Sequence, residues 1–188
     1  NVVALRVAQE VGLNQVANMA RRLGIRADLK QVSGLVLGQS EVTLLELTGS
    51  FGVLANRGVR NRPHAIRRVL DGGECKDRND YKTCRVIYPA EPDREMNQPI
   101  LEAAVADTMT DLLRGVVQSG TGRGAAIGQG VAGKTGTNND NRDLWFVGYI
   151  PDDLVTGIWF GNDNFSPTNG SSAQAAQLWG NYMSKIVR

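Results

Sequence analysis

One stretch of this chain, residues 128–141 with the sequence GQGVAGKTGTNNDN, groups side chains that can do chemistry. Lys134, Thr135 and Thr137 bring an ammonium group and two hydroxyl groups close together in the sequence. Such donors can hold an anion, either a phosphate or a carboxylate. The stretch also fits the pattern G-x-x-x-x-G-K-[ST], in which a glycine-rich loop and a lysine hold the phosphates of a nucleotide. The elements around Lys134 decide which anion is expected.

A phosphate-binding loop follows a strand and opens a helix, whose first N–H groups point at the phosphates. Here the lysine and threonine are followed by GTNNDNRD, in which glycine, asparagine and aspartate favour a turn over a helix. The next segment, LWFVGYI, has the pattern of a strand, and no alternation of strands and helices surrounds it. The phosphate-loop interpretation is therefore disfavoured.

A β-hairpin explains the same residues better, with GVAGKTGT as one strand, NNDN as the turn and LWFVGYI as the returning strand. Side chains two residues apart on a strand share a face, so Thr135 and Thr137 are expected to point together. Gly136 between them would let a ligand backbone approach closely. At a sheet edge, the free N–H groups can pair with an extended peptide or stabilise an oxyanion. The alternative is that KTGT is only a polar segment beside a turn.

Apolar residues at helical spacing predict five helices that surround this hairpin. The first two end near Gly12 and Gly24. The third runs from Leu44 to a stop at Gly58, and the last two cover 100–117 and 171–186. Residues 25–40 are expected to be a loop with a short strand. Two further strands are expected at HAIRRVLDGG and TCRVIYP, and LVTGIWFGND follows LWFVGYI after a short turn. Short turns between strands require antiparallel pairing, so we expect an α+β fold, an antiparallel β-sheet flanked by helices.

The aromatic residues near the carboxyl end are expected to form the core of this fold. The strand at 144–150 is apolar on both faces and should be covered on both sides. The last helix should bury one face. The expected core residues are Trp145, Phe146, Trp159 and Trp179, and the expected buried face of the last helix is Ala175, Trp179, Tyr182, Met183 and Ile186.

Composition excludes several classes of function. The 188 residues suit one domain, and 21 basic against 19 acidic residues give a net charge of +2, too even for a nucleic-acid surface. No apolar run approaches the ~20 residues that span a bilayer. The chain has one histidine and no Cys-x-x-Cys, so neither a metal nor a cofactor is expected.

Cys75 and Cys84 flank a polar segment that should be exposed. We expect a disulfide between them in an oxidising compartment, which would add roughly 2–3 kcal/mol by closing the loop. The alternative is a pair of free thiols without a role.

Three ordered segments resemble the transpeptidase domain of penicillin-binding proteins. They are LVLGQSEVTLLELTGSFGVLANRGVRNRP, VVQSGTGRGA and GVAGKTGTNNDNRDLWFVGYIPDDLVTGIWFGND. The class that also carries a glycan-polymerising domain is the most similar, and the first and last segments of the chain fit the same family. The Cys75–Cys84 segment matches least. The resemblance implies the penicillin-binding and serine β-lactamase-like transpeptidase fold, incomplete here, with residues 1–188 as its C-terminal portion.

The family has three motifs, S-x-x-K, S-x-N and K-T-G. Lys134-Thr135-Gly136 resembles the third, and Asn1 resembles the asparagine of the second. No serine of this chain has a lysine three residues on, and no G-x-S-x-G occurs. The resemblance therefore implies that the nucleophilic serine lies upstream, in the N-terminal part of the same domain.

The implied activity is that of a peptidoglycan DD-transpeptidase, which cross-links stem peptides ending in D-Ala-D-Ala through a serine acyl-enzyme and is acylated by β-lactams. In this scheme Lys134 and Asn1 are catalytic, and Thr135, Gly136 and Thr137 bind substrate, with the Thr137 N–H in the oxyanion hole. A DD-carboxypeptidase, a β-lactam sensor without turnover and a non-catalytic homologue remain alternatives. The implied location is the periplasmic or extracytoplasmic face of the membrane, with any anchor outside this chain.

Overall fold

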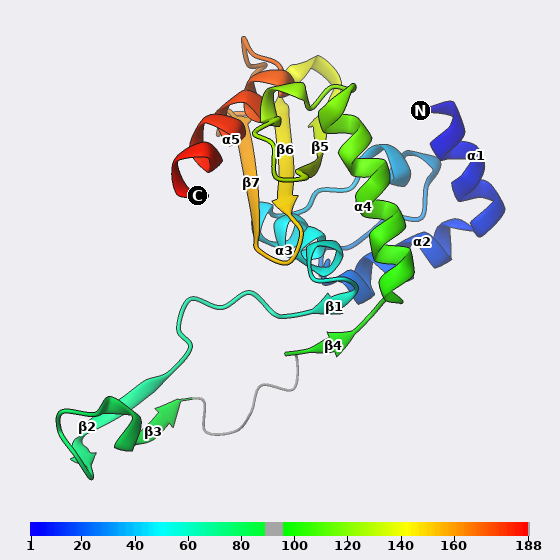
Figure 1. Ribbon diagram of the computed structural model, residues 1–188. Coiled ribbons are helices and arrows are strands. Elements are labelled where there is room, and N and C mark those ends of the chain that lie inside the picture. The colour runs from blue at the N-terminus through cyan, green and yellow to red at the C-terminus, as the bar shows by residue number, and fades with distance from the viewer. Residues whose placement is uncertain (89–95, 188) are drawn as a thin grey trace.

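The computed structural model describes residues 1–88 and 96–187 (Figure 1). The helices are α1 (Val2–Val11), α2 (Leu13–Leu23), α3 (Leu44–Ala55), α4 (Ala103–Gln118) and α5 (Ser172–Ile186), with 3₁₀ turns η1 (Ser33–Leu37), η2 (Tyr81–Thr83), η3 (Arg123–Ala125) and η4 (Asn139–Asn141). The strands are β1 (Val59–Arg60), β2 (Val69–Cys75), β3 (Cys84–Tyr88), β4 (Gln98–Pro99), β5 (Ala132–Thr137), β6 (Asp143–Ile150) and β7 (Leu154–Gly161). The α+β prediction is confirmed.

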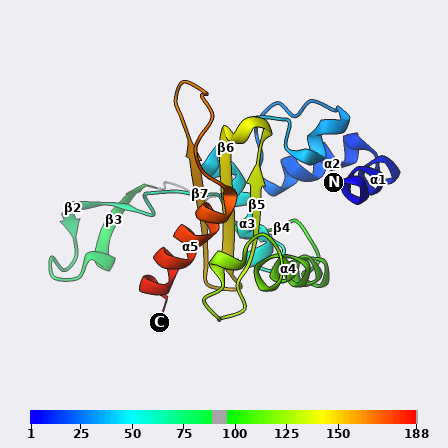
Figure 2. The same ribbon diagram turned by 90° about the horizontal axis from the view of Figure 1, so that it is seen from above.

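The main sheet has the order β5-β6-β7, and both pairings are antiparallel. Helices lie on both faces (Figure 2). A Cβ added at Gly148 would meet the Trp179 side chain of α5, whereas one added at Gly157 would meet Thr48 of α3. Gly148 of β6 and Gly157 of β7 belong to adjacent cross-strand pairs, so side chains at these two positions point to opposite faces of the sheet. The sheet is therefore enclosed by α5 on one face and by α3 and α4 on the other.

The core under α5 is built around Phe146 and Trp179, which are both fully buried. Their rings meet edge to face with centroids 5.6 Å apart, and the Trp179 Nε1–H donates to the Thr156 carbonyl at 3.0 Å. Met183, one turn further along α5, is also fully buried. The hydrogen bond satisfies the polar end of the indole, so its apolar body can be buried at low cost.

Two of the core predictions are wrong in part. Trp159 is 38% exposed, because α3 covers Gly157 but not the position two residues further along the edge strand β7. Its ring lies 6.4 Å from that of the half-buried Trp145. Tyr182 and Ile186 of α5 are 50% and 46% exposed, because the helix instead buries Ala176 and Gly180. A Cβ added at Gly180 would meet the Gly124 carbonyl of η3, so part of the buried face of α5 is turned toward that segment.

On the opposite face, Tyr149 joins the sheet to α3 and α4. Its hydroxyl and that of Thr110 on α4 lie 2.8 Å apart, and its ring meets Phe51 of α3 edge to face. Both Tyr149 and Thr110 are buried, so this hydrogen bond satisfies two polar groups inside the core.

The stops predicted at Gly12 and Gly24 are confirmed, with φ of 91° and 114°. The third helix ends at Ala55, before Gly58, whose φ of 92° turns the chain so that its N–H donates to the Val53 carbonyl at 2.7 Å. The short strand expected within 25–40 is wrong: the chain forms η1, which ends at Gly38 with a φ of 87°.

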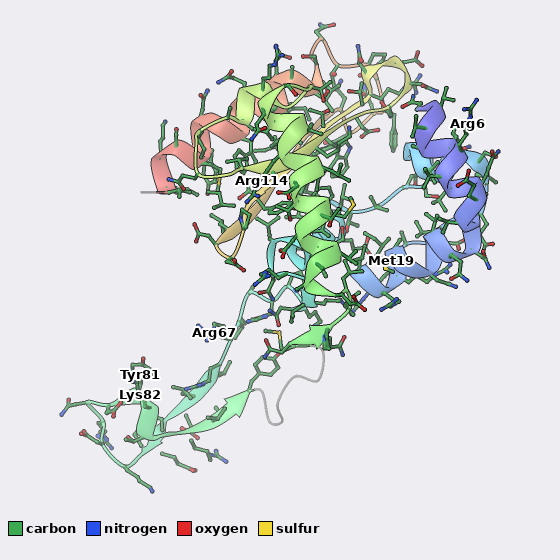
Figure 3. The ribbon with its side chains drawn as sticks, turned by 45° about the vertical axis from the view of Figure 1, so that its right-hand side comes forward. Arg6, Met19, Arg67, Tyr81, Lys82 and Arg114 are labelled. Carbon is green, nitrogen blue, oxygen red and sulfur yellow. A yellow bond between two sulfur atoms is a disulfide. The ribbon has the colours of Figure 1, made fainter. Side chains whose placement is uncertain are left out.

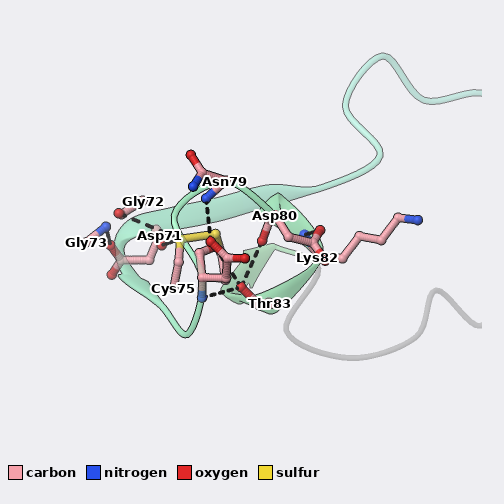
Figure 4. The surroundings of a disulfide bond; sticks show 10 residues. Asp71, Gly72, Gly73, Cys75, Asn79, Asp80, Lys82 and Thr83 are labelled. Carbon is pink, nitrogen blue, oxygen red and sulfur yellow. Dashed lines mark hydrogen bonds between the residues drawn. A yellow bond between two sulfur atoms is a disulfide. The ribbon is translucent and has the colours of Figure 1, made fainter.

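The two strands expected on either side of the cysteine loop are present, and β2 and β3 pair antiparallel. They form a separate hairpin that projects away from the main sheet (Figure 3). Figure 3 shows Arg67 where the chain leaves the body of the protein, and Tyr81 and Lys82 out on the hairpin. Cys75 and Cys84 form a disulfide there (Figure 4). The Thr83 hydroxyl accepts from the Asp77 N–H at 2.9 Å, so the short loop carries its own polar network. The hairpin is stabilised locally rather than by the core.

Within the described residues, no helix combines the length and the apolar character needed to cross a membrane.

Candidate functional site

Lys134 to Thr137 lie on β5, an edge strand of the main sheet within the described residues. The chain then turns through 138–142 and returns as β6, so the hairpin prediction is confirmed and the phosphate-loop arrangement is absent from this stretch. The turn suits its residues: Asp140 and Asn141 adopt φ of 61° and 53°, which aspartate and asparagine tolerate better than most residues. The Asn138 Oδ1 accepts from the Asp143 N–H at 2.8 Å, which closes the turn.

Along β5, the backbone N–H and C=O groups of every second residue point toward the free edge of the strand. The Asn138 N–H donates inward to the Asp143 carbonyl of β6 at 3.2 Å, whereas the Thr135 carbonyl accepts from the Lys134 Nζ at 2.7 Å. Since N–H and C=O directions alternate along a strand, the N–H groups of Thr135 and Thr137 point to the free edge. This edge can therefore pair with an extended ligand, and among the described residues nothing accepts from the Thr137 N–H.

The side chains of β5 alternate between the two faces of the sheet. Thr135 and Thr137 share one face, as predicted, and the structure shows that α5 covers this face. Lys134 projects to the other face, and its ammonium group bends back along the edge to the Thr135 carbonyl. The ammonium and the hydroxyl groups thus approach the free edge from opposite faces.

The two threonine hydroxyls have different surroundings. Thr135 is 7% exposed, and its hydroxyl is paired with that of Thr121, from the turn after α4. Thr137 is exposed, and its hydroxyl donates to the Ser172 Oγ at 2.9 Å. Thr137 is therefore the threonine that presents its hydroxyl at the surface.

The sequence did not indicate a role at this site for Thr121 or Ser172. Thr121 lies in the segment VVQSGTGRGA and Ser172 at the start of the predicted last helix, and neither was singled out as a site residue. The structure makes Ser171 the N-cap. A hydroxyl that meets a motif residue 14 or 35 positions away leaves no signal in local spacing.

The pKa of Lys134 is lowered from its ordinary value, because protein atoms around the ammonium group displace water that would stabilise its charge. Lys134 as a whole remains exposed, so this loss of water around the ammonium group is partial. A lysine with a lowered pKa loses its charge closer to neutral pH than a solvated one.

Asn1 is the N-cap residue of α1, and its side chain makes no capping hydrogen bond. The helix α1 packs on α2 and η1, and Figures 1 and 2 place the N terminus beyond the β5 edge of the sheet. Among the described residues, no hydrogen bond joins Asn1 to Lys134. Asn1 therefore lies beyond the free edge of β5, and the described residues do not bring it into contact with Lys134 through a hydrogen bond.

A family model described as the penicillin-binding protein transpeptidase domain matches residues 1–184. The penicillin-binding protein 1A of Rickettsia bellii is 36% identical over 176 residues, which cover 87% of this chain and 22% of that protein. That of Aquifex aeolicus is 34% identical over 193 residues and covers 100% of this chain and 24% of the relative. The chain therefore spans under a quarter of the length of these relatives.

Solved structures share the fold. The PonA1 protein of Mycobacterium tuberculosis in complex with penicillin V aligns with a TM-score of 0.79 at 23% identity, over 98% of this chain and 53% of that one. Penicillin-binding protein 1A of Haemophilus influenzae gives a TM-score of 0.77 at 22% identity, over 99% of this chain and 32% of that one.

Proposed function

Because the chain belongs to the penicillin-binding protein transpeptidase domain family, we propose that residues 1–188 are the C-terminal portion of a peptidoglycan DD-transpeptidase domain. The observation that carries this proposal is the edge strand β5, which turns the N–H groups of Thr135 and Thr137 toward open space. Beside them lies the ammonium group of Lys134. An edge with free N–H groups and a cation suits an extended peptide that ends in a carboxylate.

In the proposed reaction, a serine from the N-terminal part of the domain attacks the carbonyl carbon of the penultimate D-alanine of a stem peptide. The serine oxygen bonds to that carbon, the amide bond to the last D-alanine breaks, and the serine proton passes through a lysine to the leaving amine. An amine of a neighbouring stem then attacks the ester, forms the cross-link and returns the proton to the serine. A β-lactam enters the first step and stays on the serine.

We assign the residues of β5 separate parts in these steps. The Thr137 N–H donates to the oxyanion together with the N–H of the nucleophile, a contact whose loss typically costs ~10²–10³ in rate. The Thr137 hydroxyl binds the terminal carboxylate. Because the Thr135 hydroxyl is already paired with Thr121, Thr135 contributes its backbone to the bound peptide. Gly136 has no side chain, so the backbone of the ligand can approach the strand closely at this position.

Lys134 and Asn1 act on the proton-transfer side of the site. The Lys134 ammonium supplies positive charge and orders the hydroxyl of the S-x-N serine, which shuttles the proton. Asn1 hydrogen-bonds the substrate amide and the lysine of S-x-x-K. The proposed location is the extracytoplasmic face of the membrane, where an oxidising environment would keep the Cys75–Cys84 disulfide intact.

Labelling of the full-length protein with a fluorescent penicillin, followed by peptide mass spectrometry, tests the proposal. The expected result is one covalent adduct on a serine upstream of Asn1, and none on residues 1–188. An adduct on a serine of this chain, or no adduct on the protein, would contradict it. Analysis of the products from stem peptides then tells a cross-linked dimer from a peptide that has only lost D-alanine.

The lowered pKa of Lys134 predicts the alkaline limit of acylation. If the reaction needs the charged ammonium, the rate constant falls as the pH rises through the pKa of Lys134, below the range of a solvated lysine. Lys134→Arg keeps its charge at all accessible pH values, so the alkaline fall should move to higher pH in this variant. Rate constants of penicillin acylation measured across pH check this. An alkaline limb at the same pH in both proteins would assign the fall to another group.

A further inference from the structure

Two serines begin α5, and only the second reaches the edge strand. Ser171 is the N-cap, and its N–H donates to the Gln174 Oε1 at 2.9 Å. Ser172, the first residue of the helix, instead turns its hydroxyl to Thr137, whose Oγ1 donates to the Ser172 Oγ at 2.9 Å. This contact joins the face of the sheet to the helix that covers it.

Ser172 is a rigid support for the threonine, because α5 is anchored to the sheet by buried side chains. Ala175, Ala176 and Trp179, which follow Ser172 within two turns, are all fully buried. Thr137 is the last residue of β5 and is exposed, so without a partner its hydroxyl would be free to rotate. The hydrogen bond to Ser172 selects one orientation of that hydroxyl.

The pair formed by Thr135 and Thr121 has the same chemistry and a different accessibility. Thr135 is 7% exposed, so its hydroxyl is shielded from a ligand, whereas Thr137 is exposed. Of these two pairs, Thr137–Ser172 is the one that combines a fixed geometry with an accessible hydroxyl. The structure therefore singles out this pair as the one in which a ligand can replace a partner.

On the premise of the proposed function, we propose that Ser172 is a positioning residue of the carboxylate subsite. When the substrate or a β-lactam binds, the Thr137 hydroxyl turns its proton from Ser172 to the carboxylate. The Ser172 hydroxyl then donates its own proton to the Thr137 oxygen. The Thr137 hydroxyl then donates to the carboxylate and accepts from Ser172, and its donated bond is strengthened because its oxygen accepts a hydrogen bond. No proton leaves either residue.

The test measures second-order rate constants of penicillin acylation in the full-length protein and its variants. Ser172→Ala is expected to lower the rate constant about 5- to 13-fold, in line with the loss of one hydrogen bond of about 1–1.5 kcal/mol. Ser172→Thr, which keeps the hydroxyl, should restore most of it. Ser171→Ala is the matched control: it removes the hydroxyl next to Ser172, tests any effect of the helix start, and should leave the rate within about twofold.

A double-mutant cycle with Thr137→Ala separates positioning from a general structural effect. If Ser172 acts through Thr137, then Ser172→Ala has no further effect in the Thr137→Ala background, and it spares a penicillin methyl ester, which lacks the carboxylate. Equal losses in both backgrounds, equal losses for both penicillins, or no loss at all would overturn the inference. Failure of the unaltered protein to be acylated would overturn the proposed function itself, and is a distinct result.

Discussion

Replacing Lys134 with methionine in the full-length protein is expected to lower the rate of penicillin acylation by about 10²–10⁴-fold, the range for a group that assists proton transfer. Methionine keeps most of the length and volume of the side chain but removes the ammonium group. That group lies at the free edge of β5, where it donates to the Thr135 carbonyl at 2.7 Å. The loss is expected because a charge in a partly desolvated site acts more strongly on the reacting groups than it would in water.

The matched control is Lys82→Met on the projecting hairpin, far from β5 in Figure 3. It makes the same chemical change and should leave acylation unaltered. The measurement is the rate of covalent labelling by a fluorescent penicillin, with thermal unfolding of each variant as a check of folding. A Lys134→Met protein that folds and reacts within about threefold of the unaltered protein would remove Lys134 from the mechanism.

Replacing Trp179 with alanine is expected to lower the free energy of unfolding by about 3–5 kcal/mol. The side chain is fully buried, packs edge to face on Phe146, and donates from Nε1 to the Thr156 carbonyl. The truncation leaves a cavity and deprives a carbonyl of its donor, and both effects have the same sign. Because α5 also carries Ser172, a looser α5 should weaken the support of Thr137 and slow acylation as well.

Tyr182→Ala is the control on the same helix, since Tyr182 is 50% exposed and its truncation should cost under about 1 kcal/mol. Urea denaturation of both variants, followed by far-ultraviolet circular dichroism, gives the two free energies. Similar values for Trp179→Ala and Tyr182→Ala would mean that α5 is not held to the sheet by its buried indole.

The residue types around Lys134 were enough to predict the hairpin formed by β5 and β6. Asparagine and aspartate after Thr137 prefer a turn, so the chain had to return as a strand rather than continue as a helix, and the phosphate-loop pattern could be set aside. The alternation of side chains on a strand also put Thr135 and Thr137 on one face, because that rule depends only on the backbone.

Burial was predicted less well, because it depends on which element covers a position. Trp159 has the residue type of a core side chain, yet it lies beyond the reach of α3 on an edge strand and stays 38% exposed. The apolar stripe of α5 predicted that Tyr182 and Ile186 would be buried, but α5 buries Ala176 and Gly180 instead. Periodicity gives the apolar face of a helix, whereas the neighbouring elements decide which part of its surface is covered.

The sequence by itself therefore determined the α+β class, the hairpin around Lys134 and the shared face of its two threonines, since all of these follow from residue types and backbone geometry over a few neighbouring positions. Only the tertiary structure decided that the buried Thr135 hydroxyl pairs with Thr121, while the exposed Thr137 hydroxyl donates to Ser172. These contacts join residues from separate elements. Their geometry is set by how α4 and α5 pack on the sheet, which no local pattern encodes.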